Sequence, residues 1–110
     1  MYTEVRQILI TLNRDAKPSH EDLFKFRLAV SEADFLFGPE IPAYIEEICQ
    51  RGAKLRYWSG EYRDSSQPKP EGYDHEKICD GMHQEIIWLS AQFNPAHQKF
   101  KKYFISTPTP

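Results

Sequence analysis

Residues 19–49 read SHEDLFKFRLAVSEADFLFGPEIPAYIEEIC, and this stretch holds the clearest helical signals in the chain. Ser19, followed three residues later by Asp22, has the pattern of a capping box at a helix start. Apolar residues then recur three or four positions apart, at Leu23, Phe26, Val30, Ala33 and Phe37. The spacing predicts a helix from His20 to about Phe37.

The same stretch contains a sharp corner at Gly38-Pro39. Glycine readily takes the left-handed conformation that ends many helices, and proline suits the first turn of a new one. We therefore expect a second helix to begin at Pro39 or Glu40.

Phe24, Leu28 and Phe35 widen the apolar face before the corner, which predicts that the preceding helix is covered on more than one side.

The rest of the chain continues the helical pattern on both sides of this stretch. Ser65 to Gly72, SSQPKPEG, has two prolines and reads as a loop, and Asn94-Pro95 predicts a second break. Gly52 and Ser59 are small residues at which a neighbouring helix can approach closely. The predicted helices are 2–14, 20–37, 40–64, 73–93 and 95–104.

These elements predict an all-α fold with four helices in two antiparallel hairpins and a short fifth helix. At 110 residues the chain forms one domain, expected at 1–105, with a flexible tail at 106–110. The second, third and fourth helices should supply the core. The predicted core residues are Leu23, Phe26, Val30, Phe37, Ile41, Ile45, Ile48, Leu55, Ile78, Met82, Ile86, Leu89 and Phe93.

The lengths of the helices predict that the third and fourth extend beyond the first two. Four aromatic residues lie toward the end of this longer hairpin, and such side chains are enriched where proteins bind each other. These candidate interface residues are Tyr57, Trp58, Tyr62 and Tyr73. The alternative is that they cap the end of the core or are simply exposed in part.

A second candidate site is the pattern H-x-x-x-C-x-x-x-H formed by His75, Cys79 and His83. Spacings of four place the three side chains on one helical face, where imidazole and thiolate ligands could share a metal ion. One ion reaches all three only with strain, since successive turns are about 5.4 Å apart. The alternative is two solvent-facing histidines and a cysteine that packs as a small apolar residue. A disulfide between Cys49 and Cys79 is not expected, because the predicted hairpin register separates them.

Composition excludes several other classes of function. A formal net charge of -2, without a basic stripe, gives no electrostatic basis for nucleic-acid binding. The sequence has no phosphate-binding glycine loop, HExxH or GxSxG motif, so we expect neither an enzyme nor a cofactor. No apolar run approaches the roughly 20 residues that span a bilayer.

The chain resembles an uncharacterised family of small bacterial proteins in which one hydrophobic N-terminal segment precedes a polar helical domain. The residues that carry the resemblance are YTEV (2–5), residues 19–48 with the corner FLFGPEI, IIWLSAQF (86–93) and FKKYF (100–104). The family brings no established activity. The resemblance implies that the natural protein is longer at its N terminus and that a membrane-spanning segment, absent from this chain, holds the domain on the cytoplasmic side of the inner membrane.

Two functions follow from the sequence as hypotheses. The first is a non-enzymatic helical interaction domain in the cytoplasm, which binds a second copy or an unknown protein partner. Its contact surface would be the aromatic residues of the long hairpin or the apolar face of the helix at 2–14. The alternative is a metal-binding helical domain that uses His75, Cys79 and His83.

Overall fold

A computed structural model describes residues 1–15, 18–33 and 37–105 of the chain. Within these residues the fold is all-α, as the sequence predicts, and no strand is present. The described helices are α1 (Tyr2–Asp15), α2 (His20–Ala29), α4 (Glu40–Glu61), α5 (His75–Ser90) and α6 (Phe93–Ile105). The tail expected at 106–110 lies outside the described residues, as does Phe35.

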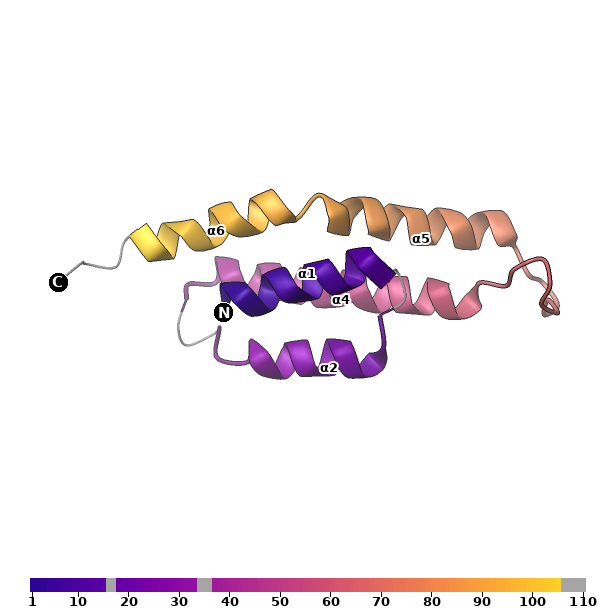
Figure 1. The fold of residues 1–110 in the computed structure, drawn as a ribbon, viewed down its shortest axis with the longest axis horizontal. Helices are drawn as coiled ribbons and strands as arrows, with labels where there is room; N and C mark the ends of the chain where they lie inside the picture. Colours follow the sequence, from indigo (N-terminus) through magenta and orange to yellow (C-terminus); the bar gives the residue numbers. More distant parts are fainter. Residues whose placement is uncertain (16–17, 34–36, 106–110) are drawn as a thin grey trace.

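The molecule is elongated, with principal extents of 62 × 23 × 21 Å. α4 and α5 pack against each other as a long hairpin, and α1 packs against α2, α5 and α6. Figure 1 shows α5 and α6 following each other end to end along one edge, with the connected ends of α4 and α5 extending beyond α1 and α2. This confirms the overhang that the helix lengths predict.

α2 begins as the sequence predicts but ends earlier. The Asp22 backbone N–H donates to Ser19 Oγ at 3.0 Å, and the Ser19 N–H donates to the Asp22 carboxylate, which completes the capping box. The helix ends at Ala29 with Val30 as its C-cap, so the predicted extension to Phe37 is wrong. The chain turns from residue 30, which places Val30 and Ala33 in the core although the helix that their spacing suggested has already ended.

The break between α5 and α6 lies at Ala91 and Gln92, and not at Asn94-Pro95 as the sequence predicts. Pro95 instead lies in the first turn of α6. Its missing N–H costs nothing there, because the first turn of a helix has no intrahelical acceptor for that group. α4 starts at Glu40 as expected and ends at Glu61, three residues before the predicted end.

The core includes residues of two helices that the list of predicted core residues left out. α1 buries Val5, Ile8, Leu9 and Leu12, and α6 buries Ala96 and Phe100. The apolar face of α1 is therefore packed inside the protein and is not available as the contact surface that the sequence suggested. Phe93 is also a wrong core prediction, since 36% of it is exposed. Of the other predicted core residues, Leu23, Phe37, Met82 and Ile86 are partly buried and pack against the core, and the remainder are buried.

A buried polar junction joins the α5–α6 break to the neighbouring helices. Tyr44 of α4 donates its hydroxyl proton to Gln92 Oε1 at 3.0 Å, and Gln92 Nε2 donates to the Trp88 carbonyl at 3.0 Å. Asn13 of α1 donates to the Leu89 carbonyl at 3.3 Å, near the C-terminal end of α5. These bonds satisfy polar groups that the end of a helix would otherwise leave without partners.

Tyr44 gives the fold a stability change at high pH. Burial raises the pKa of Tyr44 from 10.0 to about 12. Between these values the unfolded chain loses the phenol proton while the folded chain keeps it, so the free energy of unfolding falls as pH rises. We expect a Tyr44-dependent loss of about 1 kcal/mol per pH unit above pH 10. Urea unfolding of the wild type and Tyr44→Phe from pH 9 to 12 measures it, and equal slopes in both proteins would contradict it.

Candidate interaction surface

The four aromatic residues of the overhanging hairpin do not form one exposed patch. Tyr57 is 59% exposed, while Trp58, Tyr62 and Tyr73 are partly buried. The Tyr73 hydroxyl accepts from the Arg63 N–H at 2.9 Å and donates to the Arg63 carbonyl at 3.0 Å, which closes the loop between α4 and α5. Tyr73 therefore has the alternative role, which is to cap the end of the hairpin. Of the four aromatic residues, Tyr57 is the one that is mostly exposed.

The structure brings two of the three candidate metal ligands together. His75 Nε2 lies 3.4 Å from Cys79 Sγ, and His75 Nδ1 lies 2.9 Å from the Tyr73 hydroxyl. His83 is exposed further along α5. Among the residues that the structure describes, no group of three or more His, Cys, Asp or Glu side chains could hold a metal ion. Metal binding by His75, Cys79 and His83 thus stays a prediction from the sequence.

The two cysteines are both free, in agreement with the expectation that they are not bridged. Cys49 is buried between α2 and α4, and this burial raises the pKa of its thiol. A buried thiol with a raised pKa is mostly protonated at neutral pH and is a poor nucleophile. Cys49 therefore acts as a small core residue.

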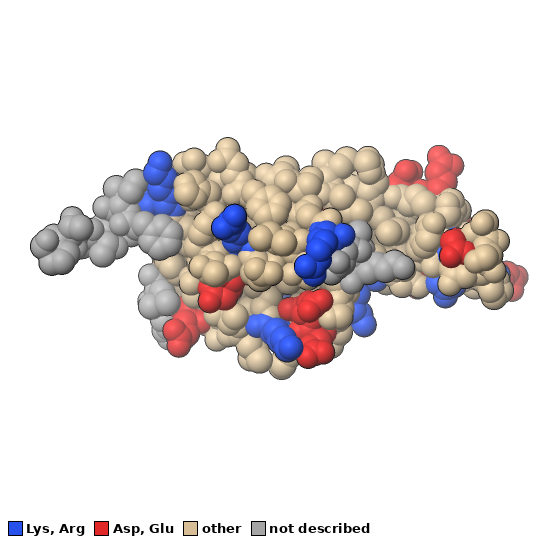
Figure 2. Space-filling view, viewed as in Figure 1, with Lys and Arg blue, Asp and Glu red and all other residues tan. Residues whose placement is uncertain are grey.

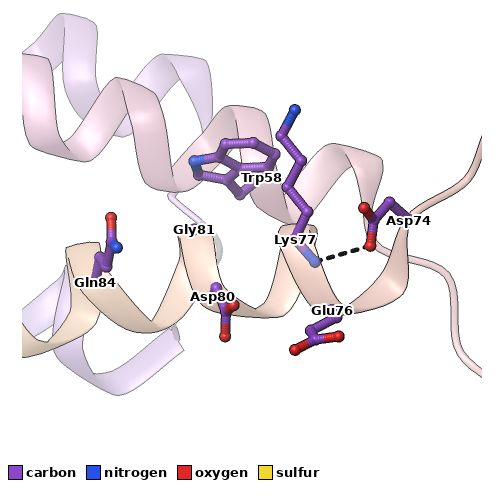
Figure 3. Close-up of a pocket in the computed structure, with 7 residues that line it drawn as sticks. All are labelled: Trp58, Asp74, Glu76, Lys77, Asp80, Gly81 and Gln84. Atoms are coloured by element: carbon purple, nitrogen blue, oxygen red, sulfur yellow. Dashed lines mark hydrogen bonds between the residues drawn. The ribbon is translucent and has the colours of Figure 1, made fainter.

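Trp58 packs directly on the backbone of α5 at Gly81. A methyl group at Gly81 would lie 2.6 Å from Trp58 Cδ2 and Nε1, well inside van der Waals contact. Beside this contact is an open hollow of about 430 Å³, shown in Figure 3. Three carboxylates of α5 and its cap line it together with Trp58 and Lys77: those of Asp74, Glu76 and Asp80. With three carboxylates and one lysine, the lining of the hollow carries a net negative charge.

Gly81→Ala is expected to lower the free energy of unfolding by about 1–3 kcal/mol, because the new methyl group displaces the Trp58 ring. The matched control is Gly60→Ala in the last turn of α4, where a methyl group meets nothing within 4 Å. Alanine favours the helix over glycine by up to about 1 kcal/mol, so the control should be stabilised. Urea unfolding compares the two variants, and equal stabilisation of both would show that Trp58 does not pack there.

A partly buried ion pair crosses the middle of the long hairpin, in which the Arg51 side chain is 30% exposed. Glu85 of α5 is 4% exposed, and its Oε2 lies 3.3 Å from Arg51 Nη1 of α4. The Arg51 guanidinium also lies over the Trp88 ring, 5.0 Å from its centroid, and 3.8 Å from the Glu47 carboxylate. Glu85 therefore points inward and pairs its charge with Arg51, although it belongs to a helix that faces solvent.

Because Glu85 points inward, the outer face of α5 and α6 has no charged side chain over a long distance. Between Asp80 and Lys99 the sequence contains one residue of the Asp, Glu, Lys and Arg types, and it is Glu85. The exposed residues that follow each other at helical spacing along this face, here called the outer row, are Glu76, Asp80, Gln84, Ile87, Ala91, Asn94, Gln98 and Lys101. The row is acidic at its start, uncharged in the middle and basic at its end.

The space-filling view shows this distribution directly. Along the edge formed by α5 and α6, Figure 2 shows an unbroken tan stretch between a red group toward the start of α5 and a blue group toward the end of α6. Ile87 is 53% exposed in the middle of the row, and Phe93 is exposed at the start of α6. The centres of protein interfaces are depleted in charged residues, whereas an ordinary solvated helix face is rich in them.

Phe24 and Leu28 form a second exposed apolar pair on α2, and both are more than half exposed. The expectation that this helix is covered on more than one side is therefore wrong within the described residues. Charges flank the pair closely, since Lys25 pairs with Glu21 at 3.0 Å and Arg27 with Glu46 of α4 at 2.9 Å. The apolar pair on α2 is thus a small area among charges, unlike the outer row.

The outer row was not predicted from the sequence, although a signal for it was present. The run GMHQEIIWLSAQFNPAHQ at 81–98 contains a single charged residue in a chain in which 27% of residues are charged. Helical periodicity separates its buried positions from its exposed ones, but the sequence alone did not show that Glu85 faces the core. If Glu85 is assigned to the surface, this helix face carries a charge in its middle and has the composition of an ordinary solvated face.

In comparisons with known proteins, no family model, curated protein or solved structure matches the chain. Within the described residues, none of the helices has the length and apolar character needed to cross a bilayer.

Proposed function

We propose that this chain is a non-enzymatic helical domain that binds another protein, and that the outer row of α5 and α6 is its contact surface. The observation that carries the proposal is the absence of exposed charge between Asp80 and Lys99, with Ile87 exposed at the centre. A helix face that only meets water normally carries alternating charges, and a face that meets protein does not.

The Arg51–Glu85 pair supports the same proposal. A buried ion pair adds little net stability compared with apolar residues of similar size, because both charges lose their hydration. What the pair does achieve in this fold is to direct the one acidic side chain of residues 81–98 into the hairpin. The outer face of the hairpin is thereby kept free of charge and suited to contact with another protein.

Photo-crosslinking tests this function whatever the identity of the partner. The photoreactive residue p-benzoylphenylalanine replaces Ser90, which is exposed beside Ala91 in the outer row, and in the control replaces the exposed Lys54 of α4. Irradiation of the native host cells should give a discrete adduct of defined mass from position 90 and none from position 54. No discrete adduct from position 90, or the same adduct from both positions, would overturn the proposal.

The place of the domain in the cell belongs to the same proposal. We place it in the cytoplasm, held at the inner membrane in a longer form of the protein, because of the resemblance to small bacterial proteins that have an N-terminal hydrophobic segment. Fractionation of host cells tests this with an antibody against the domain. Recovery of the native protein in the membrane fraction and its release by detergent supports tethering, and recovery in the cytosol alone contradicts it.

A further inference from the structure

The charges at the two ends of the outer row are complementary to each other. Asp80 and Glu76 lie at the start of the row, beside the acidic hollow at Trp58. Lys101 lies at its end, while Lys99 and Lys102 of α6 pair with Glu40 of α4 at 3.2 and 3.6 Å. Such a surface has opposite charges at its two ends and none in the middle. When two copies meet in antiparallel orientation, the acidic end of each copy faces the basic end of the other.

The positions of the charges fix where the symmetry axis of such a pair would pass. Asp80 and Lys101 are equally far along the chain from the boundary between Ser90 and Ala91. α5 and α6 follow each other end to end along one edge, so that sequence distance along the row approximates distance in space (Figure 1). Ser90 and Ala91 are small, and small side chains at the crossing point let two helices approach closely.

We propose that the outer row binds a second copy of this chain in antiparallel orientation, with a two-fold axis near Ser90 and Ala91 and with Asp80 of each copy facing Lys101 of the other. This inference rests on the function proposed above. A two-fold contact uses the same patch on both copies, which is the commonest arrangement in homo-oligomers. Ile87 of each copy then lies near the centre of the contact, where water is excluded most completely.

The acidic hollow gives each lysine a place to bind. It lies beside Asp80 and is lined by the carboxylates of Asp74 and Glu76, by Lys77 and by the Trp58 ring (Figure 3). An ammonium group that enters it meets three carboxylates, the single ammonium group of Lys77 and the Trp58 ring. The carboxylates outnumber the lysine, so the hollow has a net negative charge that attracts a cation. In the antiparallel pair, Lys101 of the second copy reaches this end of the row.

The size of the row predicts a weak dimer. Residues 76–101 extend over about 38 Å at 1.5 Å per residue, and one helix width of about 10 Å gives roughly 400 Å² per copy. A contact of about 800 Å² in total is smaller than the roughly 1,200–2,000 Å² of most specific interfaces, so we expect a weak and transient dimer. The exposed charge pairs at its ends should make it tighter at low salt.

Sedimentation velocity over a concentration series tests the dimer. Ile87→Glu places a charge at the centre of the row and should weaken association at least tenfold. Leu28→Glu is the matched control, because Leu28 is an aliphatic residue that is 59% exposed on α2, away from the row. Circular dichroism of both variants verifies that they fold. Dimerisation that Leu28→Glu abolishes and Ile87→Glu leaves intact would overturn both this inference and the proposed surface.

Charge reversal tests the antiparallel orientation. Asp80→Lys alone and Lys101→Glu alone should each weaken self-association, since each places like charges together at both ends of the pair. A mixture of the two variants should form a heterodimer as strong as the wild-type dimer, because opposite charges then meet at both ends and the like-charge contacts of each homodimer are relieved. Failure of the mixture to associate more tightly than either variant alone, with Ile87-dependent dimers still present, would overturn the antiparallel arrangement.

The failure of this inference and the failure of the proposed function give different results. A wild-type chain that stays monomeric at the highest concentration overturns the second copy as partner. If the crosslink from position 90 then has the mass of this chain plus a different protein, the outer row remains a contact surface. A monomeric chain without a discrete crosslink overturns both proposals.

Discussion

Phe100→Ala is expected to lower the free energy of unfolding by about 3–5 kcal/mol, a large part of the total for a domain of this size. Phe100 is 1% exposed. Its ring lies 5.5 Å from that of Tyr2 on α1 and 5.6 Å, edge to face, from that of Phe37. Removing the ring leaves a cavity where three segments that are distant in sequence meet, and these segments cannot collapse into it without separating from the rest of the core.

The matched control for this prediction is Phe93→Ala. Phe93 has the same side chain and opens the same helix, but 36% of it is exposed. We expect a loss of less than about 1.5 kcal/mol, because part of the ring already contacts water in the folded state. Urea unfolding followed by circular dichroism measures both variants. Similar losses for Phe93→Ala and Phe100→Ala would mean that α6 does not dock through Phe100.

Arg51→Met is expected to cost about 3 kcal/mol of unfolding free energy, because it leaves the buried Glu85 carboxylate without its partner. The methionine side chain approximates the aliphatic part of arginine, so that lost packing is a small part of the effect. The cation–π contact with Trp88, 5.0 Å from Arg51 to the ring centroid, is lost as well. Urea unfolding at neutral pH measures the loss.

Two further variants separate the ion pair from other causes. The double variant Arg51→Met with Glu85→Leu removes both charges and should recover most of the lost stability, since apolar residues often replace a buried pair at no cost. Arg56→Met, at an exposed arginine of the same helix, should change stability by less than about 0.5 kcal/mol. A double variant as unstable as Arg51→Met alone would show that the uncompensated charge is not the cause.

The double variant also tests how the ion pair inside the hairpin affects association through the outer row. Because it leaves the middle of the outer row uncharged, it should associate as the wild type does, even though the ion pair is gone. The pair matters for the proposed contact only because it holds the Glu85 charge inside. Stability and association are thus expected to vary independently in these variants.

Most of the helices could be predicted from local signals. The Ser19–Asp22 capping box and Pro39 mark helix starts within a residue or two of those observed, because capping depends on neighbouring residues alone. The small size of Gly52 also has the predicted effect, since a methyl group there would lie 2.8 Å from Leu23 Cδ2 and 3.6 Å from Leu12 Cδ1. The fold class follows from these features and from apolar spacing.

The helix ends could not be predicted in the same way. α2 ends at Ala29 although apolar residues continue at helical spacing, and α5 ends at Ser90, several residues before Asn94-Pro95. Pro95 prevents one continuous helix, because its ring would clash with the Ala91 carbonyl, and contacts from distant residues help to fix where each helix ends. Gln92 is held in the break by Tyr44, which lies 48 residues away in the chain, and Val30 and Ala33 are buried beyond the end of α2.

The candidate surface was predictable only in part. The sequence indicated aromatic residues on an overhanging hairpin, and the structure has the overhang, but Tyr73 and Trp58 make their contacts within the hairpin itself. The run at 81–98, with Glu85 as its single charged residue, was visible in the sequence, while its meaning depended on the direction of that side chain.

The sequence by itself determined the helices and the fold class of this protein, because caps, prolines and apolar spacing act over a few residues. Tertiary structure alone decided which faces are inside. It buried the α1 face that had been a candidate contact surface, exposed Phe24 and Leu28, and turned Glu85 toward Arg51. Burial depends on what packs against a helix from elsewhere in the chain, and the periodicity of the helix carries no information about its neighbours.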